Sequence, residues 1–106
     1  MRKENNMKIS EAELEVMQVI WNKKQTNSLE IASQLEHKNW THQTIRTLIT
    51  RLIAKNAIRI VEKRGKKYIY EAIIDEEDYK KEALYEFIDK VFKGNLQKLL
   101  EMVDEA

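Results

Sequence analysis

Residues 39–58 read NWTHQTIRTLITRLIAKNAI, and this stretch decides the fold. We expect a helix over about residues 41–56, with Thr41 capping its first turn and Asn56 as a left-handed stop. One face of this helix is apolar, and the opposite face is polar and carries no acidic side chain. Such a helix suits the major groove of DNA while it packs on its own domain, or it is an ordinary amphipathic surface helix. Its apolar residues recur at offsets of three and four, which places them on one stripe: Ile45, Leu48, Ile49, Leu52 and Ile53.

Two further helices are expected before this one. Ser10 and Glu13 have the spacing of a capping box and precede apolar residues at helical spacing, which predicts a first helix over about 11–23. A polar connection follows, in which Asn27 or Ser28 can cap a short second helix. The second and third helices have the size and order of a helix-turn-helix.

Downstream of the third helix, the hydrophobic period changes to two. Residues 58–63 and 67–72 alternate in character and are rich in β-branched and aromatic side chains, which predicts two strands joined by a turn at Gly65. Three helices followed by a hairpin form a winged helix. A charged edge that prevents sheet aggregation explains one or two basic residues at the hairpin tip. It explains less well the four that surround the glycine: Lys63, Arg64, Lys66 and Lys67.

Residues 75–106 differ in character from the winged helix, so we divide the chain into residues 1–74 and 75–106. Acidic residues start a helix there, Gly94 interrupts it, and Asn95 can cap a second one. Because the winged helix already has a core, this apolar segment needs a partner, either its own domain or a second copy of the chain. We favour a helical dimerisation segment, so the predicted fold class is mainly α with a small β-hairpin. The residues expected at the dimer contact are Leu84, Phe87, Ile88, Val91, Phe92, Leu96, Leu99, Leu100 and Val103.

The formal net charge of +1 hides a strong segregation of charge. Residues 41–70 carry eight basic side chains against one acidic, whereas residues 71–106 carry five basic side chains against eleven acidic. A basic middle segment predicts a polyanion-binding surface. The residues expected to contact DNA are Thr41, His42, Gln43, Thr44, Arg46, Thr47, Thr50, Arg51, Lys55, Arg64, Lys66 and Lys67.

Several classes of function are disfavoured. The 106 residues include no Cys, which excludes disulfides and thiolate metal sites, and the two His flank a turn, so no metal site is expected. We find no Gly-rich phosphate loop, paired carboxylates or Ser-His-Asp arrangement, and therefore expect neither an enzyme nor a cofactor. The start, MRKENNMK, lacks an apolar run, so we expect no signal peptide, no membrane insertion and a cytoplasmic protein. The alternative function is a protein-interaction module whose basic face docks an acidic partner.

Several motifs together carry a resemblance to a known family. They are ISEAE at 9–13, Val16-Met17, Ile20-Trp21, Trp40, TIRTLITRL at 44–52, Tyr68, Tyr70, Phe87-Ile88 and Val91 to Gly94. With these motifs the chain resembles the penicillinase repressor family of bacterial regulators, which is also described as BlaI/MecI/CopY-like. The resemblance implies a winged-helix domain joined to a helical dimerisation domain. It implies repression at short inverted-repeat operators, with the helix that carries residues 44–52 in the major groove. The groove contacts that this implies here are Gln43, Thr44, Arg46, Thr47, Thr50 and Arg51.

The resemblance also implies how repression ends. In the β-lactam branch a membrane sensor protease leads to cleavage at an Asn-Phe bond in the dimerisation helices, and the copper branch carries a Cys-rich metal motif. This chain contains neither an Asn-Phe pair nor a Cys, so neither route is expected, and a sensor protease is a partner by resemblance alone. The family continues into a last helix where this chain stops, so we expect a short or truncated member.

Overall fold

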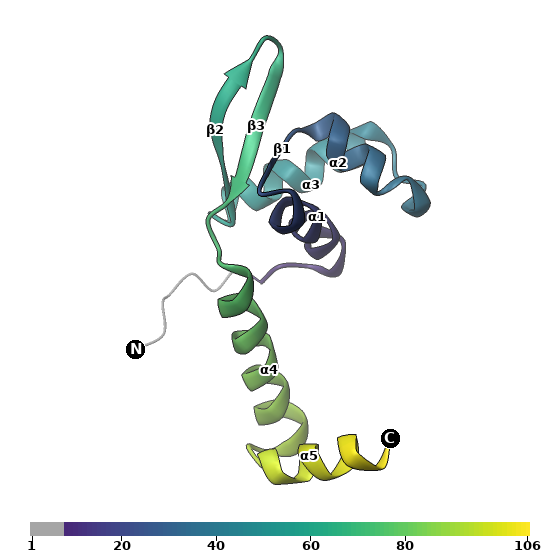
Figure 1. Cartoon of the computed structure of the whole chain (residues 1–106), viewed down its shortest axis with the longest axis vertical. Helices are drawn as coiled ribbons and strands as arrows, with labels where there is room; N and C mark the ends of the chain where they lie inside the picture. The colour runs from purple at the N-terminus through teal and green to yellow at the C-terminus, as the bar shows by residue number, and fades with distance from the viewer. Residues whose placement is uncertain (1–7) are drawn as a thin grey trace. The chain divides into compact units, whose positions relative to one another are not determined.

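The computed structural model describes residues 8–106, which fall into two compact units. One unit reaches to Ile74, and the other spans Asp75–Ala106 (Figure 1). We expected no signal peptide at the start of the chain, and residues 1–7 of that segment lie outside the described residues. Among residues 8–106, no helix combines the length and the apolar content that crossing a bilayer requires.

Helix α1 spans Glu11–Lys23 and begins at the predicted capping box. The Ser10 hydroxyl accepts a hydrogen bond from the Glu13 backbone N–H at 3.1 Å. In return, Glu13 Oε1 accepts one from the Ser10 backbone N–H at 2.9 Å. The buried face of α1 packs against the third helix, and the indole N–H of Trp21 donates to the Ile74 carbonyl at 2.9 Å. This bond fixes the end of the first unit against its first helix.

Helix α2 spans Ser28–Gln34, and the Asn27 side chain caps it by accepting from the Glu30 N–H at 2.9 Å. A short 3-10 helix, η1, follows at Glu36–Lys38, and Asn39 adopts a left-handed conformation with φ 60°. The tightened η1 turn and Asn39 redirect the chain into α3. The helix-turn-helix predicted from the sequence is therefore present.

Helix α3 spans His42–Ala54, and Thr41 caps it by accepting from the Thr44 N–H at 3.1 Å. Its predicted stop is confirmed, because Asn56 lies in the left-handed region with φ 60°. The apolar stripe faces the core against α1 and α2, with four residues buried: Ile45, Leu48, Ile49 and Leu52. The polar side of α3 is thereby left at the surface.

The predicted hairpin is present but forms only part of the sheet. Strands β2 (Ile58–Arg64) and β3 (Lys67–Ala72) pair antiparallel around Gly65, whose φ of 61° suits glycine. A third strand, β1 (Gln25–Thr26), pairs with β3 and gives the order β1-β3-β2. The sequence reading of this segment as a plain polar connection was wrong. A two-residue strand is too short to show a period, and its pairing with β3 depends on tertiary structure.

A polar cluster ties the three strands together. Gln25 Nε2 donates to one carboxylate oxygen of Glu71 at 3.1 Å, and the Arg59 guanidinium donates to the other oxygen at 2.9 Å through Nε. These bonds, from Arg59 first and Gln25 second, lower the pKa of the Glu71 carboxyl. The register shifts between Ile60 and Glu62, a bulge that interrupts the regular alternation expected for β2.

The second unit contains two capped helices. Helix α4 spans Glu76–Phe92, with Asp75 accepting from the Asp78 N–H at 3.1 Å. Lys93 (φ 54°) and Gly94 (φ 82°) then break the helix. Helix α5 spans Leu96–Glu105, and Asn95 accepts from the Lys98 N–H at 3.0 Å. The interruption and the second cap are therefore where the sequence predicted them.

Candidate nucleic-acid interface

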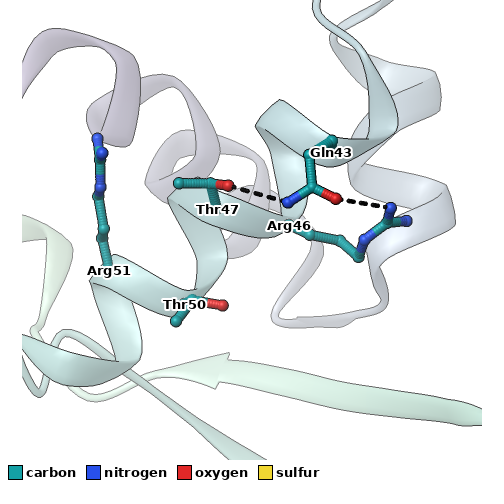
Figure 2. Close-up of a pocket in the computed structure, with 5 residues that line it drawn as sticks. All are labelled: Gln43, Arg46, Thr47, Thr50 and Arg51. Atoms are coloured by element: carbon teal, nitrogen blue, oxygen red, sulfur yellow. Dashed lines mark hydrogen bonds between the residues drawn. The ribbon is translucent and has the colours of Figure 1, made fainter.

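The exposed face of α3 gathers five of the residues predicted to contact DNA. Gln43, Arg46, Thr47 and Thr50 follow one another at helical spacing, so their side chains leave the same side of the helix. Together with Arg51 they line a shallow surface hollow (Figure 2). No acidic residue occurs within α3, so this face is basic and polar.

A chain of hydrogen bonds links three of these side chains. The Gln43 amide nitrogen donates to the Thr47 hydroxyl at 3.4 Å, and Arg46 Nη2 donates to the Gln43 amide oxygen at 3.2 Å. Figure 2 shows Gln43 between the other two, with Arg51 lying apart from them. The two arginines of the face therefore differ, since Arg46 is held by a neighbour on its own helix.

The first turn of α3 carries the remaining predicted residues of this helix. Thr41 and His42 are exposed, and Thr44 is half-buried. The Thr41 hydroxyl donates to the Thr44 hydroxyl at 3.1 Å in addition to capping the helix. These side chains extend the polar face to the N-terminal end of α3, where backbone N–H groups favour an anion.

The tip of the β2–β3 hairpin, which we call the wing, presents the predicted cations to solvent. Arg64, Lys66 and Lys67 are all exposed. Arg64 forms an ion pair with Glu62 on the same strand, whereas the Lys63 ammonium lies 5.4 Å from the ring centre of Tyr68. On the wing, Arg64 is therefore paired with a carboxylate, while Lys66 and Lys67 are exposed to solvent.

Lys55 occupies a different setting from the one predicted. Its ammonium lies 2.5 Å from Glu13 Oε1 and 2.6 Å from the Lys8 carbonyl oxygen, and the side chain is only 17% exposed. Burial acts to raise the pKa of Glu13, but the hydrogen bonds from Lys55 and Ser10 outweigh it, so the pKa lies below its ordinary value of 4.5. Lys55 therefore joins the end of α3 to the start of α1, and we leave it out of the DNA contacts.

The sequence did not lead us to predict the ion pair that Glu13 forms with Lys55. We assigned it to the capping box alone, although it lies four residues before Met17 and seven before Ile20 on the buried stripe of α1. A carboxylate on an apolar stripe indicates a buried charge that needs a basic partner. That signal was available in the sequence, but the identity of the partner was not.

The apolar residues predicted for a dimer contact divide by exposure in the second unit. Ile88 is buried, and Phe92 and Leu99 are half-buried. The aromatic rings of Phe87 and Phe92 meet edge to face with centres 5.7 Å apart. The other six predicted residues are exposed: Leu84, Phe87, Val91, Leu96, Leu100 and Val103.

The titratable side chains do not assemble into a metal site within residues 8–106. No group of three or more His, Asp or Glu there is arranged to hold an ion. Both His residues lie at the surface, on either side of the turn into α3. The side chains on the exposed face of α3 supply hydrogen-bonding groups and positive charge.

Comparison with known proteins identifies relatives along most of the chain. A family model described as Penicillinase repressor matches residues 9–105. The chain is 41% identical over 93 residues to the methicillin resistance regulatory protein MecI of Staphylococcus aureus, which covers 87% of this chain and 75% of that protein. It is 37% identical over 93 residues to the penicillinase repressor of Bacillus licheniformis, covering 87% of this chain and 72% of that protein.

A solved structure gives a matching result. The monomeric form of BlaI from Bacillus licheniformis, in complex with the blaP half-operator, is 42% identical with a TM-score of 0.58. The match covers 69% of this chain and 89% of that one. The winged-helix fold expected from the sequence is thereby confirmed.

Proposed function

Because the chain belongs to the penicillinase repressor family, a family of repressors rather than enzymes, we propose that it represses transcription as a dimer bound to operator DNA. Helix α3 enters the major groove, and the wing lies along the phosphate backbone. A DNA-binding repressor acts where the DNA is, so its place is the cytoplasm.

The exposed face of α3 is the observation that carries this proposal. It is polar, holds two arginines and no carboxylate, and is backed by a stripe of buried apolar side chains. A helix built in this way can approach base edges while its own domain holds it rigidly. The half-operator complex of BlaI, at 42% identity, adds support from a relative.

The contacts divide into those that read sequence and those that supply affinity. Arg46 is the candidate for a bidentate contact with guanine O6 and N7. Thr44 and Thr47 can meet a thymine methyl group or a phosphate, and Thr50 extends the same face. The remaining basic residues of the interface contact phosphates, which give affinity without sequence information: Arg51, Arg64, Lys66 and Lys67.

The second unit supplies the dimer contact in this proposal. Large apolar side chains are exposed along both of its helices, from Leu84 on α4 to Val103 on α5. Exposed clusters of this kind mark interaction surfaces, and a second copy of the same helices can cover them symmetrically. A dimer then presents two copies of α3 to two half-sites of an inverted repeat.

Relief of repression is proposed without cleavage at an Asn-Phe bond, because that pair does not occur in the sequence. The relieving signal is one that weakens either the contact of α3 with DNA or the contact between copies. A sensor protease enters only as the partner that the family resemblance implies.

Selection of bound duplexes from a random pool tests the proposal, at about 150 mM salt so that non-specific binding is weak. We expect an enriched inverted repeat for the full chain, and loss of the enrichment for Arg46→Ala. Enrichment of a single half-site would support sequence-specific DNA binding by this chain but refute its action as a dimer. No enrichment would refute the repressor and favour docking of the basic face on an acidic protein.

A further inference from the structure

The hydrogen bonds on α3 assign different tasks to Gln43 and Arg46. An amide side chain offers one acceptor oxygen and one donor nitrogen. Gln43 uses the nitrogen toward Thr47 and the oxygen toward Arg46, at 3.4 and 3.2 Å (Figure 2). The direction of the amide is thereby set, because its opposite orientation would place donors against the guanidinium.

Gln43 is held by its neighbours on α3 through both of its amide atoms. A glutamine that reads adenine uses both amide atoms, accepting from N6 and donating to N7. Each amide atom of Gln43 keeps one further hydrogen-bonding position, an N–H and a lone pair, but a base contact through them has to fit the amide orientation that Arg46 and Thr47 set.

Arg46 gains from the same bonds. Its guanidinium has five N–H donors, and the bond to Gln43 engages Nη2, which leaves other donors for a base edge. An exposed arginine loses much rotamer freedom when it binds DNA. A neighbour that already restrains the side chain reduces that loss at the moment of binding.

We infer that Gln43 is a specificity-determining positioning residue, which orients Arg46 toward guanine and is itself oriented by the Thr47 hydroxyl. The inference rests on the proposed DNA-binding function. It adds that discrimination at the Arg46 position depends on a second side chain, which holds the Arg46 guanidinium in place.

A double-mutant cycle on the full chain tests this inference, with Gln43→Ala and Arg46→Ala singly and together. The probes are the duplex selected above and a random duplex of equal length. Gln43→Ala should weaken binding to the selected duplex by roughly five-fold, the range of one net hydrogen bond, and leave random DNA unchanged. In the Arg46→Ala background the same change should have less than about a two-fold effect, because its target is gone.

Two matched changes complete the design. Gln18→Ala alters the same residue type at an exposed position on α1 and should not change binding. Thr47→Val removes the hydroxyl that orients Gln43 but keeps a methyl group that can meet thymine, so the part of its loss that acts through Gln43 should disappear in the Arg46→Ala background. Far-ultraviolet circular dichroism of each variant checks that the helices remain.

The outcomes separate this inference from the function it rests on. An equal loss from Gln43→Ala with and without Arg46 would overturn it and make Gln43 a direct contact. No loss from Gln43→Ala in either background would overturn it as well. If the unaltered chain binds selected and random duplexes equally, the proposed function itself fails, whatever the cycle gives.

Discussion

Removal of the Lys55 ammonium should destabilise the winged-helix unit strongly. Glu13 is 2% exposed, and the nearest positive charge is the Lys55 ammonium at 2.5 Å. Lys55→Met keeps most of the side-chain volume but leaves a buried carboxylate without a counter-charge. Breaking a buried pair in this way costs about 3–5 kcal/mol. The Ser10 N–H still donates to Glu13 at 2.9 Å, so we expect the lower end, about 3 kcal/mol.

The pH dependence of the free energy of unfolding should differ between the unaltered chain and Lys55→Met. In the unaltered chain the folded-state pKa of Glu13 lies below 4.5, so its stabilisation is present above pH 4.5 and is lost as pH falls through the folded pKa. In Lys55→Met the hydrogen bond and charge of Lys55 are gone while burial remains. The folded pKa of Glu13 is then higher than in the unaltered chain, so the variant takes up a proton at higher pH and is relieved of its unpaired buried charge earlier as pH falls. The difference between the two proteins should therefore narrow from pH 7 to about 4.

Urea unfolding followed by the fluorescence of buried Trp21 measures this difference at each pH. Glu13→Gln combined with Lys55→Met is the matched control, because it removes the buried charge and should be more stable than Lys55→Met alone. A loss below about 1 kcal/mol at pH 7, the level of an exposed ion pair, would refute the buried-pair reasoning. A difference that stays constant between pH 7 and 4 would refute the titration of Glu13.

Three further changes test other parts of the molecule. Lys66→Ala on the exposed wing should weaken binding to selected and random DNA alike and lower the salt slope of binding by about one unit per protomer. Titrations at several salt concentrations measure this slope, which should not change in the control Lys90→Ala. An unchanged slope for Lys66→Ala would remove the wing from the interface. Leu100→Glu should raise the dimer dissociation constant by roughly 100-fold or more, because in the proposed dimer contact each copy loses a leucine that its partner buries and gains a buried charge. Sedimentation equilibrium measures this constant, and an unchanged mass would contradict the dimer contact. Asn56→Ala should cost about 1 kcal/mol in urea unfolding, since alanine disfavours φ 60°, whereas Asn56→Gly should be nearly neutral, and equal losses would point to a side-chain contact instead.

The helices were predictable because their signals are local. Ser10, Asn27, Thr41 and Asn95 each cap the helix that follows them, and a cap needs only the adjacent turn of backbone. Strand β1 was not predictable, since its two residues have no period and its pairing with β3 depends on residues more than forty positions away. Local rules therefore identified the elements, while the third strand required tertiary structure.

The α3 face was predictable as a set of residues but not as an arrangement. Helical spacing decides which side chains leave the same side of α3, so Gln43, Arg46 and Thr47 could be grouped from the sequence. The bonds among them depend on rotamers, which spacing does not determine. The partner of Lys55 could not be predicted from the sequence for a related reason. Glu13 lies 42 residues away in the chain and contacts Lys55 only after the helices pack.

The break between α4 and α5 has a consequence for how the end of the chain folds. Lys93 and Gly94 both have positive φ, so the ten-residue α5 must start anew rather than extend α4. A helix this short is marginal on its own in water, and among its apolar residues only Leu99 is even half-buried. Such a segment opens locally at far lower free energy than the core does. If a second copy covers α5, its folding and the pairing of copies become one equilibrium, and the fraction of chains with an ordered last helix rises with protein concentration.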